Sequence, residues 1–508
     1  MVDQRKIQSA LISVYSKERI EELARKLVSL DIRIISTGGT FDFLQSKEIP
    51  VSSVESLTSY PSILGGRVKT LHPKVFGGIL WRRDQPSDGN DRDTYEIPSI
   101  DLVVVDLYPF EKTVANTSEE DQIIEKIDIG GISLIRAAAK NYSDVLVISS
   151  ASLYDQLFDL LEKKNGFTSL DDRRYFAGQA FNTSSHYDTE IFNYFNRREK
   201  ITAFKQSLTK SYPMRYGENP HQKGTFFGDL DKVLKKLHGK ELSYNNLVDV
   251  DAAINLIFEF SKPTVAIIKH TNPCGVATRT TLKQAYIDAL ACDPVSAFGG
   301  IVIVNGKITM DTAEELHKLF FEIVIAESYE NDALELLQSK KNRIILCQNS
   351  VAFSDKQFKS ILNGVLEQEK DLKTDQESDF QYVTKIKPLP EEMDELLFAN
   401  KIVKHLKSNT IVLSKGKQLI GCGMGQTSRV DALKQAIIKA RDFGFDPKGS
   451  VMASDAFFPF ADSVEIAHKE GITAVIQPGG SIRDADSVNY CNEHAMSMVF
   501  TGIRHFKH

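Results

Sequence analysis

Short apolar segments alternate with amphipathic helical patterns over the N-terminal part of this sequence, and this alternation constrains the fold more than any other feature. Between Ile20 and Val28, for example, apolar residues recur at the spacing of one helical face. Strands that alternate with helices predict a parallel sheet that is covered on both faces. The expected strands are residues 10–14, 32–35, 102–105 and 145–148.

The composition predicts a soluble protein of several domains. The 508 residues leave room for roughly two to four domains, and the apolar share of 42% and charged share of 26% are typical of globular proteins. A net charge of −6 argues against a nucleic-acid partner bound through a broad basic surface. The five cysteines are odd in number and widely spaced, which indicates reduced thiols. Because no apolar stretch approaches ~20 residues and no signal-peptide pattern occurs, we expect a cytoplasmic protein with no membrane partner.

Two polar stretches divide the sequence. The charged stretch at residues 195–200 predicts a boundary between a domain at 1–198 and a domain at 199–508. The second stretch predicts a linker near residues 364–388. Residues 291–298 and 453–460 share an Ala-x-Asp pattern followed by Phe at the same spacing, and each precedes a strand-like segment. This pattern predicts an internal repeat in the second domain.

A Lys-His pair, Lys269 and His270, closes the apolar run at residues 265–268. The run predicts a buried strand, and the Asn-Pro and Gly at 272–275 predict the turn that ends it. In α/β proteins ligands bind at the carboxyl ends of strands, and an imidazole exchanges a proton near neutral pH. The pair therefore predicts acid–base chemistry on an anionic substrate, provided that the backbone turns at His270 so that both side chains reach one pocket. A structural histidine is the alternative.

Two loops near the N-terminus are candidate anion sites. The Ser-Thr-Gly-Gly-Thr segment at 36–40 lies between a strand and a helix, so its hydroxyls and helix N-terminal amides suit a phosphate. An ordinary turn with Thr40 as the helix N-cap is the alternative. The segment 65–74 carries three cations and a histidine, of which Arg67 suits a bidentate anion contact and Lys69 a point charge. A solvated basic loop is the alternative there.

Tyr108 and Asp128 are further candidates in the N-terminal part. Tyr108 follows the expected strand at 102–105, where it could donate a hydrogen bond to an oxyanion or serve as an ordinary boundary residue. Asp128 precedes an expected helix whose Arg136 and Lys140 lie four residues apart on one face. Surface charge near the end of that helix is the alternative for the two cations.

The C-terminal part contributes three more candidates. Asn409 sits in a polar turn just before a strand-like segment, and Arg429 ends a Gly-rich loop. The aromatic segment at 457–460 is either core or a wall for a flat ring.

Taken together and in this order, the motifs resemble a bifunctional family of purine biosynthesis, which joins AICAR formyltransferase to IMP cyclohydrolase. The resemblance covers essentially the whole chain. It rests on Ser-Thr-Gly-Gly-Thr, Gly-Gly-Arg-Val-Lys-Thr-Leu-His-Pro, Leu-Tyr-Pro-Phe, Ile-Asp-Ile-Gly-Gly, Arg-Tyr-Gly-Glu-Asn-Pro-His-Gln, Lys-His-x-Asn-Pro-Cys-Gly, Ser-Asp-Ala-Phe-Phe-Pro-Phe and Arg-His-Phe-Lys-His.

The resemblance implies an α/β fold with two different domains. The N-terminal cyclohydrolase domain would have a methylglyoxal-synthase-like, Rossmann-type parallel sheet. The C-terminal transformylase would consist of two cytidine-deaminase-like halves. The zinc signature of the deaminases is absent, because Pro273-Cys274 lacks the second cysteine, so we expect no catalytic metal.

The resemblance also implies how the first reaction proceeds. The transformylase moves a formyl group from 10-formyltetrahydrofolate to the amine of AICAR, which gives FAICAR. His270 would act as the base, Lys269 would neutralise or protonate the transferring group, and Asn409 would bind the formyl oxygen. Family members build this site across a homodimer interface. The implied substrate contacts are Arg215, Tyr216, Asp293, Arg429 and Arg504, with Phe458 and Asp462 on the folate side.

For the second reaction, the resemblance implies closure of FAICAR to IMP with loss of water. Much of this catalysis can be positioning, because both reacting groups belong to one molecule. The implied catalytic cluster is Lys69, Tyr108, Asp128 and Lys140. The implied phosphate and substrate contacts are Ser13, Lys17, Ser36, Thr37, Gly38, Gly39, Arg67 and Thr70.

Three segments depart from the family pattern. Tyr15 and Ser16 replace the usual Ser-Asp pair before Lys17, Asp106 replaces the usual Asn before Leu-Tyr-Pro-Phe, and Ala461 replaces an Arg. The first two leave open an alternative in which the transformylase is retained and the cyclohydrolase is weakened. A second alternative is a non-catalytic nucleotide-binding regulator, which would be expected to lack the Lys-His pair.

Overall fold

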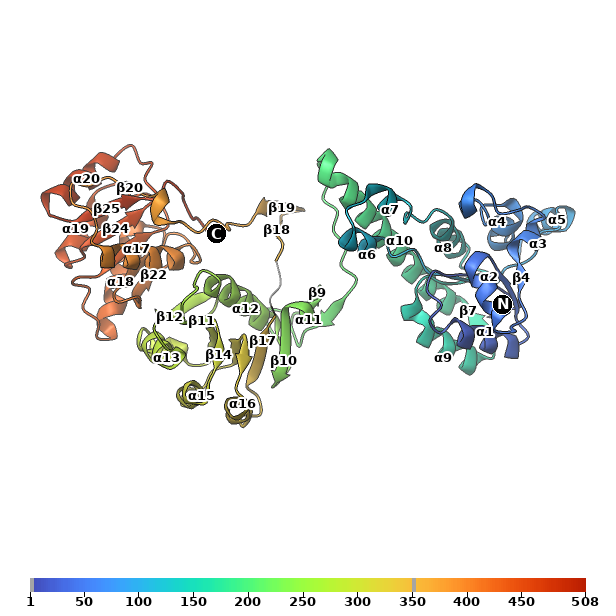
Figure 1. The fold of residues 1–508 in the computed structure, drawn as a ribbon, viewed down its shortest axis with the longest axis horizontal. Coiled ribbons are helices and arrows are strands. Elements are labelled where there is room, and N and C mark those ends of the chain that lie inside the picture. The colour runs from blue at the N-terminus through green and yellow to red at the C-terminus, as the bar shows by residue number, and fades with distance from the viewer. Residues whose placement is uncertain (1–3, 350–352) are drawn as a thin grey trace. The chain divides into compact units, whose positions relative to one another are not determined.

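The computed structural model describes residues 4–349 and 353–508, and the chain forms two compact units, Met1–Thr209 and Lys210–His508 (Figure 1). Each unit is described by itself. No helix in the described ranges is long and apolar enough to cross a membrane.

Unit 1 is built on a parallel five-stranded sheet of order β4-β3-β2-β5-β6. Strands β5 and β6 are buried along their whole length, as expected for parallel strands that are covered on both faces. The parallel sheet and the four strands expected from the sequence are confirmed. The strands are β2 (Ser9–Ser13), β3 (Arg33–Ser36), β4 (Ser52–Ser53), β5 (Leu102–Val105) and β6 (Leu146–Ile148).

Helices cover both faces of this sheet (Figure 1). On one face, α1 (Ile20–Ser29) and α9 (Tyr154–Lys164) pack against the side chains of Ile12 and Val104. On the other face, α4, α8 and α10 pack against Leu11 and Val103. Alternate strand residues therefore enter opposite cores. The remaining elements are α2 (Gly38–Ser46), α3 (Val54–Thr58), α4 (Pro73–Leu80), α5 (Pro86–Thr94), α6 (Phe110–Asn116), α7 (Glu120–Ile124), α8 (Gly130–Lys140), α10 (Leu170–Glu199), and the antiparallel pair β1 (Gln4–Lys6) and β7 (Phe167–Ser169).

Unit 2 contains two six-stranded sheets with the same order and the same strand directions. The first has the order β10-β17-β15-β13-β11-β12, and the second has the order β20-β25-β24-β23-β21-β22. In each, the three central pairings are parallel, parallel and antiparallel. The strands are β10 (Leu234–His238), β11 (Thr264–Lys269), β12 (Asn272–Thr278), β13 (Ile301–Val304), β15 (Ile323–Ala326), β17 (Ile344–Gln348), β20 (Gln381–Tyr382), β21 (Ile411–Ser414), β22 (Leu419–Gly423), β23 (Val451–Ser454), β24 (Ala474–Gln477) and β25 (Ser497–Phe500).

The internal repeat is therefore present as topology, but the two segments that predicted it are not equivalent. Residues 291–298 end a helix and lead into β13, whereas residues 453–460 end β23 and follow it. The two Ala-x-Asp segments thus occupy different places in the two halves, and their similarity is a coincidence.

One core joins the two halves of unit 2. Helices α12 (Tyr244–Ile257) and α17 (Pro390–Val403) contribute to it together with residues of both sheets, such as Ile268 and Val412. The outer faces are covered by two separate sets of helices. Those helices are α13 (Leu282–Ala291), α15 (Met310–His317) and α16 (Asn331–Gln338) in the first half, and α18 (Arg429–Asp442), α19 (Asp462–Lys469) and α20 (Asp484–Glu493) in the second.

The hairpin β11–β12 turns earlier than the sequence predicted. His270 and Thr271 form a two-residue turn with φ of +52° and +62°, and Asn272, Pro273 and Gly275 already belong to β12. Pro273 is tolerated there because β12 is an edge strand of its sheet. The backbone therefore turns at His270, which the sequence analysis required if Lys269 and His270 are to reach one pocket.

Glycines on the edge strands allow the outer helices to approach closely. A Cβ at Gly275 would lie 1.8 Å from the carbonyl oxygen of Ala289 in α13, and one at Gly421 would lie 2.2 Å from that of Ala436 in α18. No rotamer change relieves a clash with backbone. The two halves therefore use the same device at equivalent places.

We predict that Gly275→Ala destabilises unit 2 by about 1–3 kcal/mol, because α13 must move away from β12. Gly364→Ala is the matched control, since a Cβ there meets no atom within 4 Å. Thermal unfolding of the full chain measures both variants, and equal melting temperatures would contradict the close-approach argument.

Candidate functional site

The carboxyl ends of β2, β3 and β5 lie side by side in unit 1 and carry one group of candidates. Ser13 ends β2, Ser36 ends β3, and the Lys17 ammonium donates to Thr40 Oγ1 at 3.1 Å. The hydroxyl of Thr40 in turn donates to the Val14 carbonyl at 2.9 Å. Thr40 is not the helix N-cap, because α2 begins at Gly38 and Thr37 occupies that position.

Lys69 and Thr70 lie against the beginnings of two helices. A Cβ at Gly38 would lie 2.9 Å from Lys69 Nζ, and one at Gly130 would lie 2.9 Å from Thr70 Oγ1. Gly38 begins α2 and Gly130 begins α8, so both groups stand where unpaired amides favour an anion. Burial lowers the pKa of Lys17, and Lys69 lowers it further, which indicates that the two ammonium groups share one site.

Tyr108 and Asp128 belong to the same region. Asp128 accepts a hydrogen bond from the Gly131 amide at 2.7 Å, yet burial raises the pKa of its carboxyl. Burial also raises the pKa of Tyr108, and the charges of Asp128 and Tyr15 raise it further. This cluster therefore combines a carboxyl suited to accept a proton with a phenol that stays protonated.

Two residues of this region were missed by the sequence analysis. The Lys126 ammonium lies over the rings of Tyr108 and Tyr15, at 5.3 and 5.6 Å from their centroids. The Tyr187 hydroxyl donates to the Lys126 carbonyl at 2.6 Å and accepts from the Asp128 amide at 2.8 Å. No local pattern marks either residue, because α10 brings Tyr187 from far along the chain.

Other predicted contacts are not free to meet a ligand in this arrangement. Lys140 ends the 11-residue α8, roughly 15 Å of helix from Gly130, so one chain does not bring it to Asp128. Arg67 forms an ion pair with Glu125. The Ser36 hydroxyl donates to the Ile12 carbonyl at 2.7 Å, and the Thr37 hydroxyl donates to Glu55 at 3.3 Å. Gly39 lies beside Gly38 in the first turn of α2.

The side chain of Asp106 bonds to backbone amides of the loop that follows β2. Its carboxylate accepts from the amides of Tyr15 and Ser16, and burial raises its pKa despite these two bonds. The departure at this position therefore shapes the loop after β2.

In unit 2, the Lys269–His270 turn is held by a carboxylate that the sequence analysis missed. Asp249 of α12 accepts from the His270 amide at 3.3 Å and from the Thr271 amide at 2.7 Å. Lys269 Nζ donates to the Phe298 carbonyl at 2.8 Å. Asp249 thus fixes a turn whose two residues have positive φ without being glycine, a conformation that costs energy.

Asn409 lies in a buried polar cluster with Arg429. The Arg429 guanidinium donates to Asn409 Oδ1 and to Ser454 Oγ, at 2.8 and 2.9 Å, and forms an ion pair with Asp455. The amide nitrogen of Asn409 donates to the carbonyls of Gln426 and Thr427, at 3.0 and 3.3 Å. Arg429 is buried and occupied, so in this arrangement it orients Asn409 and leaves little for a phosphate.

The edge strands β12 and β22 bring the two halves of this site to one end. Ala277 bridges to Gln418 in antiparallel register, and Cys422 lies 4.0 Å from the carbonyl of Pro273. The start of β12 therefore adjoins the end of β22, next to which Asn409 lies. Within one chain, Lys269 and Asn409 stand at the same end, about three strand spacings or roughly 15 Å apart.

The remaining candidates of unit 2 have separate local surroundings. Phe458 is fully buried in the core of the second half, so a direct folate contact is not supported, whereas Phe457 and Phe460 are exposed. Asp293 is buried and forms an ion pair with Lys439 of α18. Arg215 and Arg504 lie over the rings of Tyr216 and Phe506, at 5.3 and 4.4 Å, and Asp462 begins α19 on the surface.

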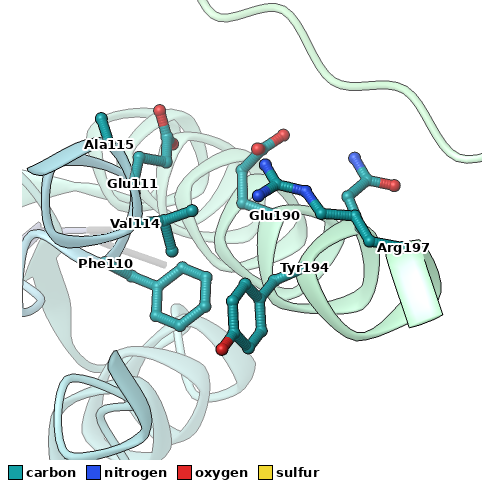
Figure 2. Close-up of a pocket in the computed structure, with 8 residues that line it drawn as sticks. Phe110, Glu111, Val114, Ala115, Glu190, Tyr194 and Arg197 are labelled. Carbon is teal, nitrogen blue, oxygen red and sulfur yellow. The ribbon is translucent and has the colours of Figure 1, made fainter. Parts of the chain in front are cut away.

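A cleft of about 190 Å³ between α6 and α10 is separate from these groups (Figure 2). Figure 2 shows Phe110 and Tyr194 at its base, with Glu111, Glu190 and Arg197 around it. Burial and the nearby Glu111 raise the pKa of Glu190. None of the residues predicted from the sequence lines this cleft.

A polar network fastens the C-terminal segment beside the Asn409 cluster. The His505 ring bonds to the carboxylates of Asp371 and Asp375, and its backbone amide donates to the Asp455 carbonyl at 3.1 Å. Burial alone would lower the pKa of His505, but the two carboxylates outweigh it and raise the pKa to about 9. Arg504 is the neighbour in sequence, so this network determines where Arg504 lies.

Within the described ranges, no group of three or more His, Cys, Asp or Glu side chains is arranged to hold a metal ion.

Comparisons with known proteins identify one family. The family described as "AICARFT/IMPCHase bienzyme" matches residues 138–439, and "MGS-like domain" matches residues 19–133. The bifunctional purine biosynthesis protein PurH of Bacteroides thetaiotaomicron is 59% identical over 508 residues, which is 100% of both chains. PurH of Aquifex aeolicus is 48% identical over 98% of this chain and 100% of its own. PurH of Caldicellulosiruptor saccharolyticus is 46% identical over 99% of this chain and 100% of its own.

The His505 network predicts a pH dependence of stability. Because folding raises the pKa of His505 from its ordinary 6.5 to about 9, its contribution is complete below pH 6.5 and is lost as the pH rises toward 9. We expect the free energy of unfolding of unit 2 to fall by up to about 3 kcal/mol across this window. His505→Gln should remove the slope, and the exposed His221→Gln should keep it. Denaturant unfolding at several pH values measures this, and an unchanged slope in His505→Gln would contradict it.

Proposed function

The chain belongs to the AICARFT/IMPCHase bienzyme family, and from this membership we propose how its residues carry the two reactions. The protein is a bifunctional enzyme of purine biosynthesis that formylates AICAR to FAICAR and then closes FAICAR to IMP. The observation that carries this conclusion is the match along the whole chain at 59% identity. A formyl-folate is the co-substrate that the first reaction implies, and we propose that it is 10-formyltetrahydrofolate.

For formyl transfer, we propose that His270 is the base. The amine of AICAR is a weak nucleophile, because its electron density is drawn into the neighbouring carboxamide. Its nitrogen attacks the formyl carbon and gives its proton to His270, and the intermediate then breaks the bond to the folate nitrogen, which takes a proton from Lys269. The turn at His270, which Asp249 holds through two backbone amides, supports this assignment.

Asn409 is proposed to bind the formyl oxygen. Arg429 can only donate hydrogen bonds, so its contact with Oδ1 leaves the amide nitrogen of Asn409 directed toward the loop carbonyls. The 3.3 Å bond to the Thr427 carbonyl is the weaker of the two. We propose that the formyl oxygen replaces this carbonyl as the acceptor of the Asn409 N–H hydrogen bond. The substrate contacts Arg215, Tyr216, Arg504, Asp462 and Asp293 remain proposals.

A second copy of the chain is proposed to complete this site. Lys269 and Asn409 stand roughly 15 Å apart within one chain, which is too far for both to contact one formyl group. We therefore propose a homodimer whose two chains share the transformylase site.

For cyclisation, Asp128, Tyr108 and Lys69 are proposed as the catalytic groups. The carboxamide nitrogen attacks the formyl carbon, Asp128 accepts its proton, and Tyr108 and Lys69 stabilise the oxygen that leaves as water. The leaving water carries two of the three N–H protons of the reacting groups. The raised pKa values of Asp128 and Tyr108 support these roles. Lys140 remains a prediction that the length of α8 does not support within one chain.

The phosphate of the nucleotide is proposed to lie where α2 begins. Lys17 and Lys69 adjoin this place, Thr70 lies at the beginning of α8, and the remaining proposed contacts are Ser13, Ser36, Thr37, Gly38, Gly39 and Arg67. Arg67 would have to leave Glu125 to reach an anion.

A coupled assay tests whether both halves are active. Given AICAR and 10-formyltetrahydrofolate, the purified protein should form IMP without accumulation of FAICAR. Accumulation of FAICAR without IMP would instead support a weakened cyclohydrolase, and loss of both products would support a nucleotide-binding regulator.

Two variants test the division of the reactions. We expect His270→Ala to lower formyl transfer at least about 100-fold, since it removes the base, while cyclisation of supplied FAICAR continues. Lys69→Ala should lower cyclisation alone. Separate assays of each step measure this, and a parallel loss of both steps in either variant would contradict two separate sites.

A further inference from the structure

Lys126 lies between two aromatic rings beside the cyclisation site. Its ammonium stands 5.3 Å from the ring centroid of Tyr108 and 5.6 Å from that of Tyr15. The two rings meet edge to face, with centroids 5.5 Å apart. Cations at this distance from ring faces are attracted by the ring quadrupole.

One hydroxyl from a distant helix holds the backbone of the residue that carries this cation. Tyr187 of α10 donates to the Lys126 carbonyl at 2.6 Å and accepts from the Asp128 amide at 2.8 Å. The ring of Tyr187 is buried against Phe110, with centroids 6.1 Å apart. Tyr187 therefore holds both ends of the segment that carries a cation at one end and a carboxylate at the other.

The cation and the carboxylate act on Tyr108 in opposite directions. A positive charge over the ring stabilises the phenolate and makes the hydroxyl a stronger acid, whereas Asp128 disfavours the phenolate. Asp128, Lys126, Tyr15 and Tyr187 face Tyr108, and Lys69 faces Asp128. Of the two cations, Lys126 is the one that lies over the ring of Tyr108.

We propose that Lys126 is a positioning residue for cyclisation, which acts through Tyr108 and is fixed in place by the Tyr187 hydroxyl. The proposal rests on the role of Tyr108 given above. Lys126 strengthens the hydrogen bond that the phenol donates to the departing oxygen, and it need not contact the substrate.

Lys126→Met tests the proposal, because it keeps the length of the side chain and removes the charge. The ionisation of Tyr108 is measured directly as tyrosinate absorbance of the full chain, with Tyr108→Phe as the blank. We expect the Tyr108 midpoint to rise by about half a pH unit or more. Lys126→Arg should restore it, since a guanidinium also binds ring faces.

Cyclisation kinetics provide the second measurement. We expect kcat for supplied FAICAR to fall about threefold to tenfold in Lys126→Met with KM unchanged, and formyl transfer to stay at its original rate. An unchanged Tyr108 midpoint would overturn the proposal, as would a rise in KM alone, which would identify Lys126 as a phosphate contact. If Tyr108→Phe cyclises FAICAR at the original rate, the proposed role of Tyr108 in cyclisation is wrong. The midpoint shift of Tyr108 in Lys126→Met would still be observed in that case, so the two failures are distinguishable.

Tyr187→Phe removes the hydroxyl that bonds to the backbone of Lys126 and Asp128 and keeps the buried ring, so it tests whether this hydroxyl positions Lys126. We expect it to lower kcat in the same direction as Lys126→Met, and the double variant to lose less than the product of the single losses. Tyr194→Phe is the matched control, because it removes a hydroxyl from the same helix and the same aromatic cluster (Figure 2). Independent, multiplicative losses would show that Tyr187 does not act through Lys126.

Discussion

Burial of the strands on both faces is the constraint on which the rest of the structure depends. Strands such as β5, β13 and β21 are buried along their whole length, so they leave no room for exposed polar groups. Chemistry is therefore confined to strand ends. His270 follows β11, Asn409 precedes β21, and Asp106 follows β5. The backbone groups freed at these ends also need partners, which is why carboxylates such as Asp249 and Asp106 are directed at amides.

The repeated halves of unit 2 show how one topology carries two different contributions. In the first half Lys269 and His270 lie at the turn that joins β11 to β12. In the second half the equivalent turn, at Gly416 and Lys417, carries none of the candidate residues, and Asn409 lies at the opposite end of β21. Because β12 and β22 meet in antiparallel register, opposite ends of equivalent strands come together. This packing explains why the candidate residues of the two halves lie at opposite ends of equivalent strands.

Regular periodicity made the parallel sheet of unit 1 and its helices predictable, and tertiary contacts explain what was missed. Asn-Pro and Gly at 272–275 are turn formers, but an edge strand accepts Pro273 and the approach of α13 requires Gly275. The true turn at His270 depends on Asp249, which lies 21 residues earlier. Phe458 could not be told from its exposed neighbours by composition, since burial is decided by the fold. The site residues rested on family resemblance, and their proximity could not be read from spacing.

The two departures in unit 1, Tyr15 and Asp106, are linked by structure. Asp106 accepts the backbone amides of Tyr15 and Ser16, so the carboxylate at one departure fixes the loop that carries the other. That loop directs the Tyr15 ring against Tyr108 and beneath Lys126. A free carboxylate close to a phosphate would repel the phosphate. The carboxylate of Asp106 instead accepts hydrogen bonds from two backbone amides, which partly compensate its negative charge. Tyr15, Asp106 and Lys126 therefore form one local arrangement beside Tyr108.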